Sequence, residues 1–178
     1  MRYLTKDELT NVLKIARADN PRNHAIMLIA YWHGMRASEI VGKNGLRGID
    51  IRDGEITVRR LKGSLKSTHP LISHADPLFD EKTIVERLAS ENPGVLFPIN
   101  RTTFWRFFQK YQAAAGIKQG QAHPHILKHS IAMHSRKAGI EMVQTYLGHK
   151  NINNTRIYWT ISDEEAATAV AKVIQEGL

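Results

Sequence analysis

Most of the chain carries apolar residues at helical spacing. Thr5 and Glu8 form a capping box, which predicts that a helix begins here and ends before Asn20-Pro21. Its apolar positions lie three or four residues apart: Leu9, Val12, Leu13 and Ala16. Residues 22–33 are apolar on nearly every side, so they predict a buried central helix that Gly34 ends. A short helix is expected over residues 37–41.

Residues 46–72 change to the pattern of short strands. Asp53-Gly54 is a hairpin signal, and Ile56 and Val58 alternate with polar residues after it. A second turn is expected at residues 62–64, followed by a strand near residues 68–72. The pattern predicts a small three-stranded antiparallel sheet beside the helices, which makes the fold α+β and mainly α-helical.

Helical spacing returns in the second half of the chain. Helices are predicted near residues 77–90, 102–115, 124–138, 140–147 and 162–176, with Gly139 and Gly148 as stops. The helix over 102–115 carries an aromatic stripe, which we interpret as core rather than as a surface that stacks on bases. The stripe consists of Phe104, Phe107, Phe108 and Tyr111.

Charge adds information on the partner. The 178 residues include 25 Lys and Arg against 17 Asp and Glu, a net charge of +8. Nine basic residues and one acidic residue fall within residues 98–160, whereas the tail after residue 160 is acidic. This imbalance favours a nucleic-acid partner. The longest apolar run, Ala25–Trp32, is far shorter than the roughly 20 residues of a membrane span, so a cytoplasmic location without membrane contact is expected.

The sequence lacks the residues that several classes of chemistry require. The chain has no cysteine, which excludes disulfides, thiolate metal sites and a cysteine nucleophile. Four histidines crowd together, but no glutamate lies between His125 and His129 as a zinc hydrolase requires, so we expect no metal. A glycine-rich phosphate loop and a nucleophile elbow are also missing. His129 and His134 are interpreted as structural.

What remains is a set of cations and a tyrosine. Cations bind phosphate oxygens and stabilise a pentacovalent transition state, a tyrosine hydroxyl can attack phosphorus, and a lysine can protonate the leaving oxygen. The candidates follow helix stops, turns or one helix face: Arg36, Lys62, His125, Lys128, His149 and Tyr158.

The order of these residues resembles a known family, the tyrosine recombinases or phage integrases. The resemblance spans roughly residues 3–160 and matches the catalytic domain of that family. It rests on four segments: Gly34–Ile40 (GMRASEI), His125–Ser130 (HILKHS), Tyr146–His149 (YLGH) and Asn154–Tyr158 (NTRIY). The stretch over residues 60–71 is similar to the fimbrial phase-variation inversion enzymes, which are also short. Most other relatives carry an additional N-terminal domain, so the chain either resembles the fimbrial type or is a fragment.

The resemblance implies a role for each candidate. Arg36 would bind the scissile phosphate, and Lys62, or Lys66 in the same turn, would protonate the 5′-hydroxyl leaving group. His125 and His149 would hydrogen-bond the phosphate or assist proton transfer. Tyr158 would form a 3′-phosphotyrosyl bond, and no metal, ATP or other cofactor is needed.

The resemblance also implies an assembly on double-stranded DNA. Residues 1–160 would form the catalytic domain of a homotetramer that can be a monomer without DNA. Residues 161–178 would form a helix that docks on a neighbouring subunit or on its own. Contacts with DNA are expected from the following cations: Lys66, Arg101, Arg106, Lys110 and Lys118.

One departure affects the chemistry. Lys128 stands where the family normally has arginine, whose planar fork grips two phosphate oxygens. Lysine keeps the charge but loosens the geometry, which predicts a slowing of roughly 100-fold. The residues are therefore also compatible with a DNA-binding protein of the same fold whose catalysis is weakened. They leave open a single-strand relaxing activity, as in type IB topoisomerases, and a general basic nucleic-acid binder.

Overall fold

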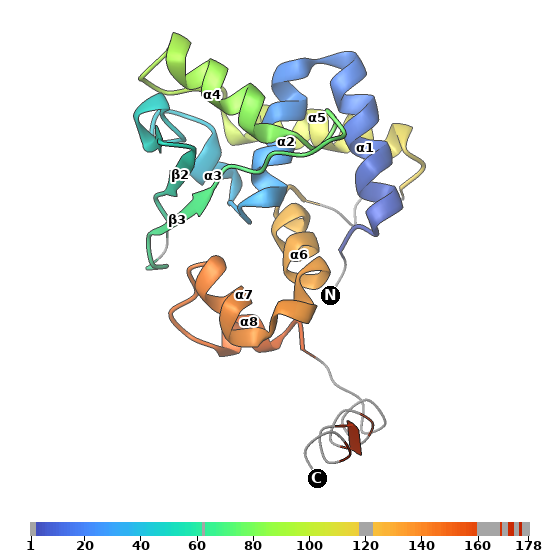
Figure 1. Cartoon of the computed structure of the whole chain (residues 1–178). Coiled ribbons are helices and arrows are strands. Elements are labelled where there is room, and N and C mark those ends of the chain that lie inside the picture. The colour runs from blue at the N-terminus through green and yellow to red at the C-terminus, as the bar shows by residue number, and fades with distance from the viewer. Residues whose placement is uncertain are drawn as a thin grey trace.

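The structure is a computed structural model, in which residues 3–61, 63–117 and 123–159 are described, together with Thr168, Ala171, Lys172 and Gln175. Eight α-helices and three strands are defined within these residues (Figure 1). The mainly helical α+β fold predicted from the sequence is confirmed. The predicted second turn at Lys62 lies partly outside the described residues, and so does most of the helix predicted over 162–176.

Helix α2 (Pro21–Trp32) forms the centre of the fold. Nine consecutive residues, Asn23–Tyr31, are buried, as its all-round apolar pattern predicts. Helices α1 (Lys6–Asp19), α4 (Glu81–Glu91) and α6 (His125–His134) pack against it. Asn20 ends α1 and caps α2, because its side chain accepts hydrogen bonds from the backbone of Arg22 and Asn23.

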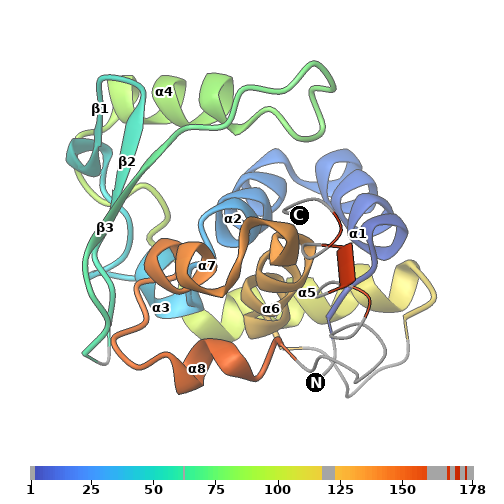
Figure 2. The ribbon, with the colours of Figure 1, turned by 60° about the horizontal axis from the view of Figure 1, so that its bottom comes forward.

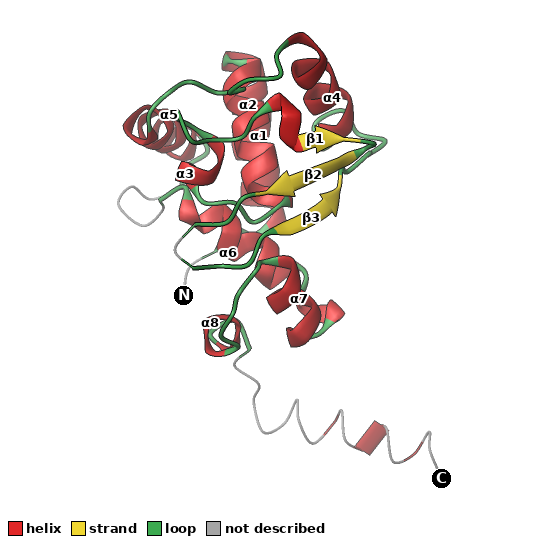
Figure 3. Cartoon of the chain, turned by 90° about the vertical axis from the view of Figure 1, so that its left-hand side faces the viewer, coloured by secondary structure: helices red, strands yellow, loops and turns green. Residues whose placement is uncertain are grey.

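The sheet covers one side of these helices. It has the order β1 (Ile51–Arg52), β2 (Glu55–Val58), β3 (Ser67–Pro70), and both pairings are antiparallel (Figure 3). Ile56 and Val58 of β2 point into the core, as their alternation predicts. The predicted three-stranded antiparallel sheet is confirmed, and Leu65, between β2 and β3, hydrogen-bonds to Gly148 near the later helices.

The aromatic stripe lies in the core, as predicted. Helix α5 (Arg101–Ala114) buries all four of its members, and Phe104, Phe108 and Tyr111 have no exposed surface. The Tyr111 hydroxyl donates to Asp19 at 2.6 Å and accepts from Asn23 at 2.8 Å, which ties α5 to α1 and α2. The polar face of α5 is therefore left outward, and it carries Arg101 and Arg106.

Two boundaries and one additional helix differ from the prediction. The helix predicted from residue 77 begins at Glu81, because the Asp76 side chain accepts from the backbone of Leu78 and holds a turn there. Helix α6 ends at His134 and is followed by a separate 3₁₀ turn, Arg136–Ala138. Short helices α3 (Ala37–Ile40) and α7 (Ile140–Tyr146) lie as predicted, but α8 (Asn153–Arg156) was not predicted.

Gly148 joins the sheet to the last helices. It follows α7 with a φ of +67°, and its carbonyl accepts the backbone N–H of Leu65 at 2.9 Å. A Cβ at this position would meet the carbonyl oxygen of Leu65, so only glycine lets the two segments approach this closely.

We expect Gly148→Ala to lower the free energy of unfolding by about 3 kcal/mol, since positive-φ strain of about 1–2 kcal/mol adds to the backbone clash. Gly116→Ala is the matched control, because Gly116 has a φ of +73° with open space around its Cβ direction. It carries only the strain. Urea denaturation of both variants tests this, and equal losses would contradict the close approach.

Candidate active site

Arg36 is fixed where α2 gives way to α3. Gly34 takes a φ of +54° and turns the chain, and Arg36 then caps α3. The Arg36 guanidinium donates to Glu39 at 2.9 Å and to the carbonyl of Leu61 at 3.2 Å. Its side chain keeps 23% of its surface exposed. Part of this guanidinium is thus held by protein and part faces outward.

Glu39 forms ion pairs with two of the cations, Arg36 and Arg60. Its side chain is fully buried and accepts from the backbone of Leu61 at 2.9 Å, besides its bonds with Arg36. Burial alone would raise the pKa of the Glu39 carboxyl. The hydrogen bonds from Leu61 and Arg36 and the charge of Arg60 outweigh it and hold this pKa below its usual value. A permanent carboxylate is therefore locked between two guanidinium groups.

Arg60 is a structural cation rather than a phosphate ligand. Its fully buried guanidinium lies 3.5 Å from the Glu39 carboxylate. It also donates to the carbonyls of His33, Gly34 and Tyr146, at 2.8, 2.9 and 3.0 Å. Its donors are engaged by protein, so Arg60 binds the end of α2 to the end of α7.

Lys128 approaches the same cluster from α6. Only 1% of its surface is exposed, and its ammonium donates to the carbonyl of Leu147 at 3.3 Å. Burial lowers the pKa of Lys128 to about 7, and the charges of Arg60 and Arg36 contribute to the decrease. The site therefore holds an ammonium that gains stability when an anion arrives.

His149 follows Gly148 and is held by the last short helix. Its Nδ1 lies 2.9 Å from the Thr155 hydroxyl of α8, and only 7% of its surface is exposed. Burial lowers the pKa of His149 to about 4, with the charges of Lys128 and Arg36 adding to the effect. The ring is thus neutral and can donate one hydrogen bond to a phosphate.

Tyr158 is folded into the site instead of facing solvent. Only 3% of its surface is exposed, and its hydroxyl lies 2.7 Å from Nδ1 of His129. Burial raises the pKa of Tyr158 to about 12, although the charge of Arg36 opposes this increase. The ring of His125, at the start of α6, packs edge-on against His129 with centroids 4.5 Å apart.

The structure brings most sequence-predicted catalytic residues together. Figure 2 shows α6 near the middle of this region, with α7 and α8 beside it. Lys62 lies outside the described residues, but its neighbour Leu61 contacts both Glu39 and Arg36. Lys66 is exposed on the same connection. The residues that converge are as follows: Arg36, His125, Lys128, His149 and Tyr158.

Three of the predicted DNA contacts lie on α5, and one, Lys118, lies outside the described residues. Arg101, Arg106 and Lys110 are exposed on α5, which lies on the same side as α3, α8 and the β2–β3 connection (Figure 3). Lys110 pairs with Asp19 at 2.7 Å, so its charge is partly neutralised.

Sequence reasoning missed four residues that shape the site. Glu39 and Arg60 lie inside the motif segments, but their ion pair joins distant parts of the chain and left no local signal. Thr155 orients His149, and its position three residues before Tyr158 was the available clue. His129, interpreted as structural from the sequence, contacts the Tyr158 hydroxyl. His134 instead contacts Tyr31, which fits a structural role.

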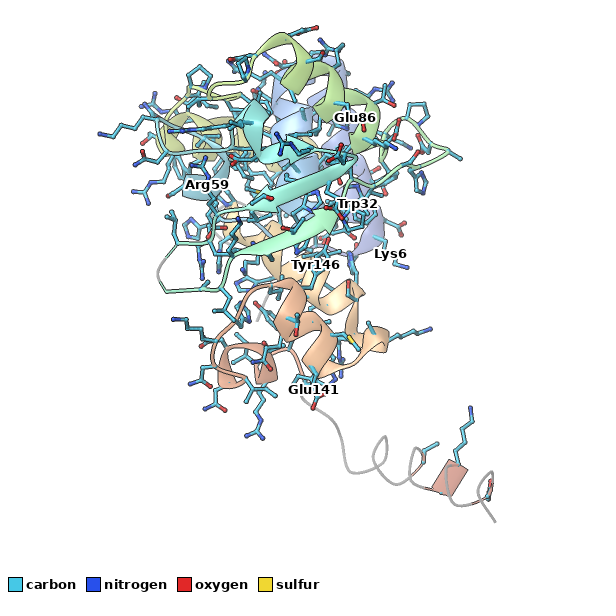
Figure 4. The ribbon with its side chains drawn as sticks, turned by 60° about the vertical axis from the view of Figure 1, so that its left-hand side comes forward. Lys6, Trp32, Arg59, Glu86, Glu141 and Tyr146 are labelled. Atoms are coloured by element: carbon cyan, nitrogen blue, oxygen red, sulfur yellow. The ribbon has the colours of Figure 1, made fainter. Side chains whose placement is uncertain are left out.

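A second buried histidine cluster lies under β3. His33 is 2.7 Å from the Glu81 carboxylate and 3.0 Å from His69, whose ring stacks on Tyr146 with centroids 3.9 Å apart. Figure 4 shows Tyr146 between the sheet and the helices below it. In the described part of the chain, no group of three or more acidic, histidine or cysteine side chains is placed to hold a metal ion. No described helix is long and apolar enough to cross a membrane.

Comparison with known proteins places the chain in a family. Residues 2–165 match the phage integrase family. The chain belongs to this family. It is 33% identical over 174 residues to the type 1 fimbriae regulatory protein FimE of Escherichia coli K12, covering 88% of this chain and 84% of FimE. It is 30% identical to the tyrosine recombinase XerA of Pyrococcus furiosus, covering 95% of this chain and 60% of XerA.

The fold of this family member is shared with solved recombinases. The structure of the XerH site-specific recombinase bound to its difH substrate superimposes with a TM-score of 0.72 at 22% identity. The match covers 94% of this chain and 53% of XerH. The catalytic-domain fold that the sequence motifs implied is therefore confirmed.

Lys128 gives stability a distinct pH dependence. Its folded-state pKa of about 7 lies below the ordinary 10.5, so between these pH values the unfolded chain holds a proton that the folded chain has released. Stability contributed through Lys128 therefore rises with pH across this window, by up to about 1.4 kcal/mol per unit. We expect Lys128→Met to lose this slope in urea denaturation at pH 7, 8 and 9. The Lys82→Met control should keep the pH slope of stability, because the Lys82 side chain is 44% exposed. An unchanged slope in Lys128→Met would contradict the lowered pKa of the buried Lys128 ammonium.

Proposed function

We propose that this protein is a site-specific DNA recombinase that cleaves and rejoins DNA through a 3′-phosphotyrosyl bond to Tyr158. The observation that carries the proposal is the convergence of Tyr158, Lys128 and His149 near the Arg36 guanidinium, which the buried carboxylate of Glu39 holds in place. Relatives in the same family are named tyrosine recombinases, which fits this chemistry.

The cations would hold the scissile phosphate. Arg36 offers the exposed part of its guanidinium, and Lys128 offers an ammonium that burial has left in need of a counter-charge. His125 and His149 would complete the set with neutral N–H donors. Because these groups are fixed before substrate arrives, they can stabilise the extra negative charge of the pentacovalent transition state without reorganising.

Strand cleavage would be a transesterification. The Tyr158 oxygen bonds to phosphorus, the bond from phosphorus to the 5′-oxygen breaks, and Lys62 gives that oxygen a proton, with Lys66 as the alternative donor. Leu61 is anchored to Glu39 and Arg36, which keeps the β2–β3 connection beside the phosphate site. The phosphotyrosyl bond conserves the energy of the phosphodiester, so the reaction needs no ATP and no metal to reverse.

DNA would cover the side of the molecule shown by α3, α5, α8 and the β2–β3 connection. Phosphate contacts are assigned to the exposed cations of that side, Lys66, Arg101, Arg106 and Lys110. Lys118, outside the described residues, is assigned the same role from the sequence. Such contacts position the duplex and make binding salt-dependent. The XerH structure carries its DNA substrate, which supports the same class of partner here.

A homotetramer on two DNA sites is the assembly we propose. A lambda integrase tetramer has been solved on a Holliday junction and shares the fold at 20% identity with a TM-score of 0.70. Residues 161–178 would form the segment exchanged between subunits, following the catalytic domain of residues 1–160. An apolar pocket lined by Trp32, Ile131 and Met142 offers a surface for it. The bacterial cytoplasm or nucleoid is the proposed place of action.

Covalent trapping tests the proposal. Wild-type protein in chelator should form a protein–DNA adduct on nicked duplexes drawn from the DNA that flanks its gene, and Tyr158→Phe should form none. Tyr3→Phe is the matched control and keeps the adduct, because Tyr3 lies outside the site. A denaturing gel reads the result. If Lys128→Arg forms the adduct and the wild-type protein does not, the wild type is better described as a DNA-binding protein with weakened catalysis.

Binding should change the charge of Lys128. At pH 8 its ammonium is mostly deprotonated, since its pKa is about 7, and a DNA phosphate beside it restores the charge. We expect up to one proton taken up per protomer, measured by titration calorimetry in two buffers of different ionisation enthalpy. The protein should carry Tyr158→Phe to prevent cleavage. Adding Lys128→Arg abolishes the uptake, because arginine stays charged; equal uptake in both contradicts the assignment.

A further inference from the structure

The proton of Tyr158 needs an acceptor. A phenol attacks phosphorus well only as it loses its proton, and burial keeps the pKa of Tyr158 at about 12. His149 already uses its Nδ1 for the Thr155 hydroxyl. The ring of His125 packs edge-on against that of His129. The histidine that contacts the Tyr158 hydroxyl is His129, at 2.7 Å from its Nδ1.

We propose that His129 is the general base that accepts the Tyr158 proton during strand cleavage and returns it during ligation. The proposal rests on the recombinase function proposed above and extends it to a residue outside the set of candidates. It follows from the position of an imidazole nitrogen within hydrogen-bond distance of the oxygen that reacts.

The proton transfers balance with the assigned roles. During cleavage the Tyr158 hydroxyl proton moves to Nδ1 of His129 as the oxygen–phosphorus bond forms. Lys62 loses a proton to the departing 5′-oxygen. During ligation the 5′-hydroxyl attacks, its proton returns to Lys62, and His129 gives its proton back to the tyrosine oxygen. No oxidant, metal or additional reactant is consumed.

The environment of His129 suits a base. Burial lowers the pKa of its imidazole, and the neighbouring Lys128 charge adds to the decrease, so the ring is unprotonated at neutral pH. A phosphate bound by Lys128 brings negative charge next to the ring and favours the imidazolium that cleavage creates. The helix is anchored next to this residue, since the hydroxyl of Ser130 accepts the backbone N–H of Leu4 at 2.9 Å.

A purely structural role for the same contact makes a different prediction. If His129 only holds Tyr158 in place, any side chain with an acceptor at the Nδ1 position will serve. His129→Asn provides such an acceptor but cannot take a proton at neutral pH. His129→Phe removes the acceptor as well. The two variants therefore separate positioning of the phenol from its deprotonation.

The helix supplies a matched control. His134 lies on α6 as well, and its Nδ1 contacts a tyrosine hydroxyl, that of Tyr31, at 2.9 Å. His134→Asn thus changes the same kind of contact away from the site. Melting curves of all variants confirm folding before rates are compared.

The experiment measures single-turnover adduct formation on the nicked duplexes. We expect His129→Asn and His129→Phe to be slower than wild type by on the order of 100-fold or more, and His134→Asn to be unchanged. The ratio of the His129→Asn rate to the wild-type rate should increase about tenfold per unit from pH 7 to pH 9, because only the phenolate then reacts. Lys128 and His125, which neighbour His129 on α6, are present in both proteins, so any direct effect they have on the phosphate cancels in this ratio.

A sulfur leaving group separates the base from the acid. In a duplex with a 5′-bridging phosphorothiolate the departing thiolate needs no proton, so Lys62→Ala should recover and His129→Asn should stay slow. Two results overturn the role of His129 and leave the proposed function intact. One is that His129→Asn recovers its rate of adduct formation on the phosphorothiolate duplex. The other is that His129→Asn reacts at the wild-type rate on the ordinary duplex. Absence of an adduct from wild type on every duplex overturns the proposed function and this inference with it.

Discussion

The pairing of one buried carboxylate with two guanidinium groups is the constraint on which the site depends. Glu39 has no exposed side-chain surface, and it binds Arg36, Arg60 and the backbone of Leu61. Arg60 extends the network to the carbonyls that end α2 and α7. Removing the Glu39 carboxylate would leave the buried Arg60 guanidinium without a counter-charge, which typically costs about 3–5 kcal/mol. Segments separated by more than a hundred positions in sequence are joined by this one network.

The network leaves the site with excess positive charge. Arg60 already neutralises part of the negative charge of Glu39. The positive charges of Arg36, which is partly exposed, and of Lys128, which is buried, are therefore only partly compensated. The lowered pKa values of Lys128 and His149, about 7 and 4, both follow from burial reinforced by neighbouring cations. Cations crowded in this way repel one another, and a phosphate diester relieves the repulsion. The same arrangement that destabilises the free protein would be preorganised for the more negative transition state of the proposed cleavage.

Local patterns in the sequence predicted the elements whose signals are local. The capping box, the apolar run before Gly34 and the aromatic stripe led to α1, α2 and α5, and the Asp53-Gly54 turn led to the sheet. The turn before α4 was missed because the Asp76 side chain competes with helix formation, a choice that spacing does not reveal. Candidate site residues came from the order of motifs. Their supporting contacts, such as Arg60 with Tyr146, depend on tertiary packing and have no periodicity.

Helix α6 combines the two halves of the chemistry. Lys128 lies near Glu39 and Arg60, whereas the next residue, His129, contacts the hydroxyl of Tyr158, the proposed nucleophile. Successive positions on a helix differ by about 100° in direction, so one rigid element can serve a phosphate and a phenol at once. A lysine in place of arginine would hold the phosphate less rigidly, but it would also make the charge beside His129 responsive to the bound anion. In the proposed mechanism, phosphate binding and activation of Tyr158 would thereby be coupled through adjacent side chains of a single helix.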